Sequence, residues 1–311
     1  YQNWLVRFGS STDERIEEAG VWRERAFDIN ELSHSVTVTT IARFAYDGFV
    51  GNKLHEMKWD AIVMDEASMI SLISIIYPLY QQKPQKFIIA GDPFQIEPIV
   101  AIEQWKDENI YKIVGLNQQG SFAKPITQPH DYLVTNLETQ YRSIPAIGEI
   151  FSRFTYDGIL KHHRKSETQR PLKLNGINVQ PVNLIKFPVS KYENIYRAKR
   201  LESGTPYQSY SALFTFEFTR WLAEQIQNNK TSTFRIGVIA PYVAQANILS
   251  KLHDSWTSKP NNVEIQVGTI HGFQGDECDI IIAVLNPPPS ISTDPRMFLN
   301  KQNILNVAIS R

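Results

Sequence analysis

Two adjacent carboxylates are the first feature of this sequence that could do chemistry. Asp65 and Glu66 directly follow the apolar run Ala61–Met64. Side chains alternate along a strand, so neighbouring acids at a strand end project in different directions and can perform different tasks. One carboxylate can hold a divalent cation while the other orients or deprotonates a water. The alternative, two solvated acids at the end of a strand, stays open at this point.

A second polar turn follows the apolar run Phe87–Ala90. Gly91 lets the backbone turn tightly after a strand, and Pro93 restricts the turn further. The amide of Gln95 could orient a water or a phosphate oxygen. An ordinary Asp-Pro turn is the alternative interpretation, and a second polar turn after the Asp65–Glu66 pair makes that alternative less attractive.

Two other segments could bind an anion. Arg142 precedes Pro145, where a helix is expected to begin, and a cation at that end opposes the helix dipole. Its partner could be a phosphate or a neighbouring acid. Residues 267–277 form a glycine-rich loop that exposes backbone amides, with Thr269 adding a hydroxyl. Arg311 follows an apolar helical stripe at the end of this sequence. The simplest interpretation of this segment is a core helix that ends in a solvated cation.

The elements that must position these residues alternate between strands and helices. Each chemically interesting turn follows a short apolar run, which is typical of a parallel sheet whose strands are covered on both faces. Ligands of such sheets bind beyond the carboxyl ends of the strands. The sequence therefore predicts an α/β fold. The expected strands are Val36–Thr40, Ala61–Met64, Phe87–Ala90, Ile236–Ala240, Val263–Val267 and Ile280–Leu285, and the expected helices are Ser68–Leu79, Ile144–Phe154, Ala212–Asn228 and Val243–Leu252.

Composition places limits on the kind of protein. The 311 residues are 42% hydrophobic and 21% charged, which suffices for a packed core and, by length, two domains. The 32 basic and 32 acidic side chains cancel, so bulk positive charge cannot hold the chain on nucleic acid. A single cysteine, Cys278, excludes an intramolecular disulfide and favours an intracellular location, cytoplasmic or nuclear. No apolar run approaches the roughly 20 residues that a membrane span needs.

The net charge of zero hides an asymmetry. Residues 1–136 carry 12 basic and 18 acidic side chains, whereas residues 137–311 carry 20 and 14. Ten of the basic residues lie in Lys161–Arg200, opposed only by Glu167 and Glu193. This stretch is either a solvated basic surface or a phosphate-binding one.

Taken together and in this order, the segments resemble the motifs of superfamily 1 helicases, in the branch of the nonsense-mediated-decay and senataxin-type enzymes. Val63–Ser68 resembles the Walker B segment, and Ala90–Gln95 resembles the motif that senses the γ-phosphate. Gln140–Arg142 is similar to the start of the second RecA-like domain. Residues 274–277 and Leu305–Arg311 resemble the last two motifs of the family.

The resemblance implies two RecA-like domains of P-loop NTPase type, residues 1–136 and 137–311, with ATP and Mg²⁺ between them and single-stranded DNA or RNA across the top. It implies that Asp65 holds Mg²⁺, that Glu66 activates water and that Gln95 contacts the γ-phosphate. Arg142 and Arg311 would be arginine fingers, which increase the rate by about 10³–10⁵ in nucleotide hydrolases. Tyr141, Gly275 and Glu277 would contact the nucleotide, and the nucleic-acid strand would pass Thr40, Pro241, Tyr242 and Thr269.

One departure from the family limits the expected activity. The sequence contains no G-x-x-x-x-G-K-[ST] phosphate-binding loop, and Gly48–Lys53 has the wrong spacing. We therefore expect a first domain that is truncated at its N-terminus, further domains elsewhere in the polypeptide, and little activity of this stretch alone. The leading interpretation is an ATP-dependent helicase or translocase motor, with 5′ to 3′ polarity implied only by the branch. The alternative is a non-catalytic nucleic-acid-binding or scaffolding module derived from a helicase.

Overall fold

The chain divides into two compact units in the computed structural model. Unit 1 comprises Tyr1–Pro93 and Glu97–Asn117, and unit 2 comprises Phe94–Ile96 and Gln118–Arg311. The structure describes residues 4–8, 14–19, 21–23, 32–50, 53–98, 100, 102, 105, 108–116, 132–165, 172–174, 177–188, 191–227, 233–273, 276–286 and 298–310.

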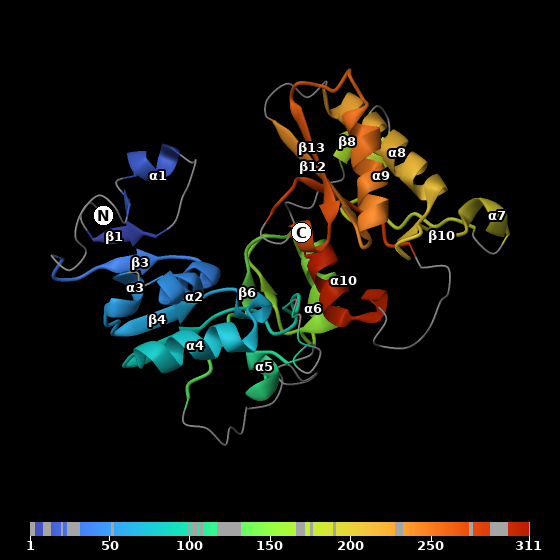
Figure 1. Ribbon diagram of the computed structural model, residues 1–311. Helices are drawn as coiled ribbons and strands as arrows, with labels where there is room; N and C mark the ends of the chain where they lie inside the picture. The colour runs from blue at the N-terminus through green and yellow to red at the C-terminus, as the bar shows by residue number, and fades with distance from the viewer. Residues whose placement is uncertain are drawn as a thin grey trace. The chain divides into compact units, whose positions relative to one another are not determined.

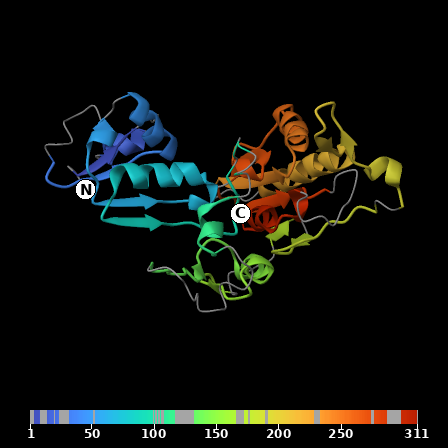
Figure 2. The same ribbon diagram turned by 60° about the horizontal axis from the view of Figure 1, so that its bottom comes forward.

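Unit 1 contains two small groups of parallel strands. Strand β1 pairs with β2 and β3, and β4 pairs with β5. Figure 2 shows β4 and β5 running in the same direction, with α4 lying along them. The elements of unit 1 are β1 (Leu5–Arg7), α1 (Glu14–Glu18), β2 (Trp22–Arg23), β3 (Val36–Val38), α2 (Ile41–Val50), α3 (Lys53–Glu56), β4 (Ala61–Met64), a 3₁₀ turn (Ala67–Met69), α4 (Leu72–Gln82), β5 (Lys86–Ile89) and α5 (Ile110–Ile113).

Two features of unit 1 differ from the sequence-based expectation. Strands β4 and β5 are not covered on both faces, because Val63, Phe87 and Ile88 are exposed. Helix α4 begins later than expected and continues through Pro78 to Gln82. A proline inside a helix removes one backbone donor, but Pro78 is buried together with Ile75, and this packing offsets the lost hydrogen bond.

Unit 2 is built around a parallel sheet with β12 between β13 and β14. Helices α8 and α9 pack side by side and against this sheet, and α10 packs against α6 (Figure 1). The elements of unit 2 are β6 (Thr139–Gln140), α6 (Pro145–Thr155), β7 (Lys161–His162), β8 (Leu172–Leu174), β9 (Ile177–Val179), α7 (Glu193–Tyr196), β10 (Lys199–Arg200), β11 (Pro206–Tyr207), α8 (Ser209–Gln227), β12 (Phe234–Ala240), α9 (Val243–Asp254), β13 (Val263–Thr269), a 3₁₀ turn (His271–Phe273), β14 (Ile280–Ala283), a second 3₁₀ turn (Phe298–Asn300) and α10 (Gln302–Ile309).

Strand β12 is buried on both faces from Ile236 to Ala240, and side chains on its two faces belong to different parts of the core of unit 2. Val238 belongs to the cluster that contains Leu249 of α9, whereas Ile239 belongs to the cluster that contains Ile304 and Val307 of α10. Successive side chains of a strand point to opposite faces, so helices on either side can both bury apolar surface against one strand. The parallel sheets, with helices packed on the strands, confirm the predicted α/β fold class.

The short segment Phe94–Ile96 belongs to unit 2 although it lies within the sequence of unit 1. Ile96 is buried in the same cluster as Ile304 and Val307. The side chain of Asn306, which is fully buried, donates from Nδ2 to the carbonyl oxygen of Phe94 at 3.0 Å and to Oη of Tyr156 at 2.7 Å. One amide thus joins α10, the end of α6 and the turn that follows β5.

We expect Asn306→Leu to lower the free energy of unfolding by about 1–3 kcal/mol, because the carbonyl of Phe94 would lose its buried donor. Urea denaturation of the variant measures this loss. Asn247→Leu, at an exposed position on α9, is the matched control and should change stability little. Equal stabilities of the two variants would contradict the proposed importance of the Asn306 amide.

Candidate active site

The carboxyl ends of β4 and β5 lie next to each other in unit 1. The N–H of Ala90 donates to the carbonyl oxygen of Met64 at 2.8 Å, and the N–H of Ala67 donates to the carbonyl oxygen of Ala90 at 3.0 Å. These two bonds hold the turn with Asp65 and Glu66 beside the turn that begins at Gly91. The structure therefore brings together the two polar turns of unit 1 that the sequence analysis identified separately.

The backbone at Glu66 adopts a left-handed conformation, with φ of 52° and ψ of 39°. A residue with a side chain costs energy in this region, and such conformations are concentrated at functional sites. The N–H of Glu66 donates to Oδ1 of Asp65 at 2.9 Å, so the first carboxylate stabilises the turn that carries the second. Both side chains are exposed.

Tyr111, in α5, is a residue that the sequence analysis did not identify. It is 5% exposed, and its hydroxyl has no hydrogen-bond partner among the described residues. Burial raises the pKa of this phenol far above its usual value, and the negative charges of Asp92, Glu66 and Asp65 raise it further. The hydroxyl thus lies in the field of three carboxylates from the ends of β4 and β5, and this makes Asp92 a third acid of the site.

A glycine is required at position 91 for this arrangement. Its φ is +144°, which side-chain-bearing residues rarely adopt, and a Cβ there would lie 2.7 Å from Oη of Tyr111 and 2.9 Å from the backbone nitrogen of Ala67. Tyr111 lies twenty residues after Gly91 in a segment without a recognisable motif, so no local pattern could have identified it.

Gln95 lies in unit 2 and is half-buried. Its neighbours Phe94 and Ile96 hold it there, through the hydrogen bond from Asn306 and the apolar cluster around Ile239. The turn after β5 therefore carries Asp92 in unit 1 and Gln95 in unit 2.

Arg142 and Glu277 form an ion pair in unit 2, with Nε of Arg142 2.6 Å from Oε1 of Glu277. Both side chains are partly exposed. Of the two partners that the sequence allowed for Arg142, a phosphate or an acid, the structure shows an acid, and it is one of the other predicted site residues. A charge-assisted bond of this kind is directional, but between partly exposed side chains it contributes only about 0–1 kcal/mol, so Arg142 can still change its partner.

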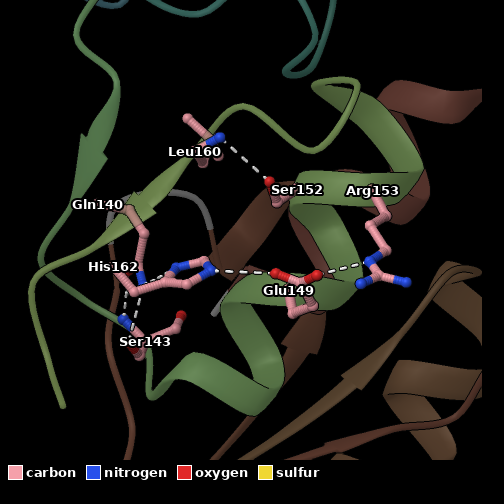
Figure 3. Close-up of polar contacts among 7 residues, drawn as sticks. All are labelled: Gln140, Ser143, Glu149, Ser152, Arg153, Leu160 and His162. Carbon is pink, nitrogen blue, oxygen red and sulfur yellow. Dashed lines mark hydrogen bonds and ion pairs between the residues drawn. The ribbon is translucent and has the colours of Figure 1, made fainter. Parts of the chain in front are cut away.

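The side-chain amide of Gln140 bonds both backbone polar groups of Ser143, and these bonds stabilise the turn that carries Arg142. Oε1 of Gln140 accepts from the N–H of Ser143 at 2.8 Å, and Nε2 of Gln140 donates to the carbonyl oxygen of Ser143 at 2.9 Å (Figure 3). The exposed ring of Tyr141 lies 4.5 Å from the ring of His163, measured between centroids. Helix α6 begins at Pro145 directly after this turn.

Three of the four residues predicted for the nucleic-acid path lie in unit 2, at the ends of β12 and β13. Ala240, the residue before Pro241, pairs with Thr269 in the sheet register, so Pro241, Tyr242 and Thr269 share one edge. Pro241 and Tyr242 line a small hollow together with Asn286. Burial raises the pKa of Tyr242.

The two threonines of the predicted path have local hydrogen bonds. Oγ1 of Thr269 accepts from the N–H of Gly272 at 3.2 Å, and Oγ1 of Thr40, in unit 1, accepts from the N–H of Arg43 at 3.2 Å. Thr269 caps the short 3₁₀ turn His271–Phe273, and Thr40 caps the start of α2. A hydroxyl oxygen that accepts in this way can still donate its own hydrogen to a phosphate. Gly275 and Arg311 lie outside the described residues.

Three cations of the basic stretch Lys161–Arg200 have partners within the protein. Nζ of Lys161 lies 3.0 Å from Oε2 of Glu138, Arg197 pairs with Glu193 at 4.0 Å, and Arg200 donates to the carbonyl oxygen of Gly204 at 2.6 Å. For these three residues the contacts favour a solvated basic surface over a phosphate-binding one. None of the helices in the described parts of the chain is long and apolar enough to cross a membrane.

The chemistry of the donors at the ends of β4 and β5 fits a hard cation. Asp65, Glu66 and Asp92 supply carboxylate oxygens, the ligand type that Mg²⁺ prefers. Among the described residues, no three Asp, Glu, His or Cys side chains are grouped so that they could hold a metal ion by themselves. One or two of these carboxylates would therefore share the cation with waters and substrate phosphates. The arrangement can therefore combine a metal-binding acid with a second acid that activates water.

Comparisons with known proteins agree with these features. Residues 119–311 match the family described as "AAA domain". The chain is 27% identical over 290 residues to the yeast Helicase SEN1 (Saccharomyces cerevisiae). The aligned residues cover 89% of the chain and 12% of that protein. It is 27% identical over 265 residues to the mouse (Mus musculus) 5′-3′ DNA helicase ZGRF1, covering 83% of the chain and 12% of the relative.

A third relative is the Drosophila melanogaster Regulator of nonsense transcripts 1 homolog, 27% identical over 266 residues, which cover 83% of the chain and 20% of that protein. The chain thus spans only a minor part of the length of these relatives.

We expect Tyr111→Phe to flatten the dependence of stability on pH in the alkaline range. In the unfolded chain a tyrosine loses its proton near pH 10, whereas the folded chain retains it at Tyr111 because the pKa is raised. The unfolded state therefore binds fewer protons above pH 10, and the free energy of unfolding falls as pH rises, by up to about 1.4 kcal/mol per pH unit.

Urea titrations between about pH 9 and 11 would measure this slope. Tyr80→Phe, at an exposed ring, is the control and should leave the wild-type slope nearly intact. If both variants have the same slope, the Tyr111 phenol does not lie in the buried, negatively charged environment described.

Proposed function

Because the chain belongs to the AAA domain family and to the superfamily 1 helicases of the branch that includes Sen1 and the nonsense-transcript regulators, we propose that it forms the motor of an ATP-dependent helicase. The motor would hydrolyse ATP with Mg²⁺ and move on single-stranded DNA or RNA. The branch implies 5′ to 3′ movement. Residues 1–136 and 137–311 would form its two RecA-like domains.

The observation that carries this proposal is the meeting of two polar turns at the ends of β4 and β5. Asp65 would hold Mg²⁺, and Glu66, on its strained left-handed turn, would orient and deprotonate the attacking water. Asp92 adds negative charge beside them and favours a bound cation. Bound Mg²⁺ would neutralise charge on the phosphates during transfer.

Residues of unit 2 would supply positive charge and nucleotide contacts. Gln95 would contact the γ-phosphate, and Arg142 and Arg311 would stabilise the charge that develops on the phosphates. The ion pair with Glu277 supports a switching role for Arg142, because a partly exposed guanidinium can exchange a carboxylate for a phosphate without being desolvated anew. Tyr141, Gly275 and Glu277 would contact the nucleotide.

The nucleic-acid strand would pass the shared edge of β12 and β13. Pro241, Tyr242 and Thr269 lie together there, and Tyr242 offers a partly buried ring close to a hollow. Aromatic stacking and backbone contacts of this type bind single strands without reading their sequence. Thr40 would contribute from unit 1.

A second function, a non-catalytic nucleic-acid-binding or scaffolding module, is favoured by one observation. The 311 residues contain no G-x-x-x-x-G-K-[ST] loop, whose lysine and backbone amides hold nucleotide phosphates in these enzymes. Nucleotide turnover by the full-length protein separates the two functions.

We expect the full-length protein to hydrolyse ATP faster when single-stranded nucleic acid is added, and Glu66→Gln to lower kcat by about 10²- to 10⁴-fold, since the general base is lost. Binding of ATP with Mg²⁺ should persist in this variant because Asp65 remains. Steady-state ATPase assays and nucleotide-binding titrations measure the two effects. Glu56→Gln, at an exposed position of α3, is the matched control.

Wild-type turnover that Glu66→Gln leaves unchanged would contradict the role of the acid pair. Absence of turnover by the full-length protein, with single strands still bound, would establish the non-catalytic alternative.

A further inference from the structure

Strand β7 and the residue after it place three consecutive side chains against the segment that carries Arg142. Lys161 pairs with Glu138, the ring of His162 meets the amide of Gln140, and the ring of His163 meets Tyr141. The parallel register, in which Gln140 faces His162, produces this succession. The middle contact is the least exposed, with the side chain of His162 at 15% exposure.

The orientation of the Gln140 amide is determined by the backbone of Ser143. The N–H of Ser143 can only donate, so the atom it meets at 2.8 Å must be the amide oxygen. The carbonyl of Ser143 can only accept, so the atom it meets at 2.9 Å must be the amide nitrogen. The second hydrogen of that nitrogen then faces Nδ1 of His162 at 2.9 Å.

The protonation of His162 follows from this orientation. Because Gln140 donates to Nδ1, that nitrogen must accept and cannot carry a hydrogen. The hydrogen of the neutral ring is therefore on Nε2, where it faces Oε2 of Glu149 at 3.4 Å (Figure 3). Every hydrogen in this chain of contacts has an acceptor in front of it.

Gly148 of α6 provides the space for this arrangement. A Cβ at this position would lie 2.5 Å from Nδ1 and 2.6 Å from Cε1 of His162, and 2.8 Å from Nε2 of Gln140. Real Cβ atoms do not approach so closely, so a side chain would push the ring and the amide apart. Gly148 therefore lies at the place on α6 where His162 and Gln140 contact this helix.

We propose that His162 is a positioning residue for Arg142. The neutral ring holds the amide of Gln140, the amide holds both backbone polar groups of Ser143, and these contacts define the turn from which Arg142 extends. The proposal rests on the proposed function only in that Arg142 acts on the nucleotide. The hydrogen bonds among His162, Gln140 and Ser143 do not depend on that role.

Protonation of His162 would break this order, because a hydrogen on Nδ1 would point at the hydrogen of the Gln140 amide. Two charged groups of α6 lie near His162. Oε2 of Glu149 faces Nε2 of the ring at 3.4 Å, and Nε of Arg153 lies 2.5 Å from Oε1 of the same carboxylate. The hydrogen bond from Arg153, and then that from His162, lower the pKa of Glu149. On the His162 strand, Lys161 is paired with Glu138.

Two variants separate the hydrogen bond from the bulk of the ring. His162→Asn keeps an acceptor, the amide oxygen, close to the place of Nδ1, and it does not titrate. His162→Phe keeps a ring but has no acceptor. His34→Phe, at an exposed histidine of unit 1, is the control.

In the full-length protein, ATPase assays should show kcat lowered roughly 10- to 100-fold in His162→Phe, as for a catalytic group displaced by about 1 Å, with KM for ATP little changed. His162→Asn should recover most of kcat. Equal kcat losses in both variants would overturn the proposal.

Nitrogen NMR of the histidine-labelled full-length protein supplies a readout that does not need activity. Assigned by its loss in His162→Asn, the ring should show a hydrogen on Nε2 and none on Nδ1 at neutral pH. The side-chain amide signal of Gln140 should shift in His162→Phe. A hydrogen on Nδ1 would overturn the proposal even in an active enzyme, whereas the expected spectra without ATP turnover would uphold the contact and reject only the proposed function.

Discussion

The buried amide of Asn306 is the interaction on which the arrangement of unit 2 depends. A buried amide is costly unless its polar atoms find partners. The nitrogen of Asn306 donates to the carbonyl of Phe94 and to the hydroxyl of Tyr156, whereas its oxygen has no partner among the described residues. Phe94 directly precedes Gln95, and Tyr156 follows α6, the helix that begins after Arg142. Asn306 itself lies on the helix that leads to Arg311. Three segments with proposed roles therefore share one polar contact inside the core.

The strands and helices were predictable wherever apolar periodicity is strong. The run Ala61–Met64 is a strand with those bounds, and β12 and β13 extend the expected strands by two residues at one end or the other. Residues 236–240 of β12 are buried on both faces, because α9 packs on one face and α10 on the other. The exposure of Val63, Phe87 and Ile88 on β4 and β5 could not be predicted, since an apolar run indicates a strand but not which elements pack on it. Helix α4 continues through Pro78 because the burial of this residue outweighs the poor helix propensity of proline.

The candidate site was predictable to the extent that its residues follow strands. Asp65, Glu66 and Gly91 lie together because parallel strands end at one edge, a rule that needs no knowledge of tertiary contacts. Tyr111 was missed, since it acts through partners distant in the chain and belongs to no pattern of types and spacing. Asn306 lies within the motif Leu305–Arg311, but nothing in that motif indicates its partners Phe94 and Tyr156. The pairing of Arg142 with Glu277, 135 residues later, likewise joins two predicted residues in a way that neither motif indicates.

The position of Phe94–Ile96 in unit 2 has a consequence for the order in which the chain can fold. Phe94 and its partner Asn306 are 212 residues apart, so their contact closes a long loop. Contacts this far apart in sequence form late, because the loop entropy must be overcome before they stabilise anything. During synthesis, Phe94 and Ile96 are made before α10, so they cannot reach their final packing until α10 has been added. The core of unit 2 is thus completed by a helix that closes on a segment made 212 residues earlier.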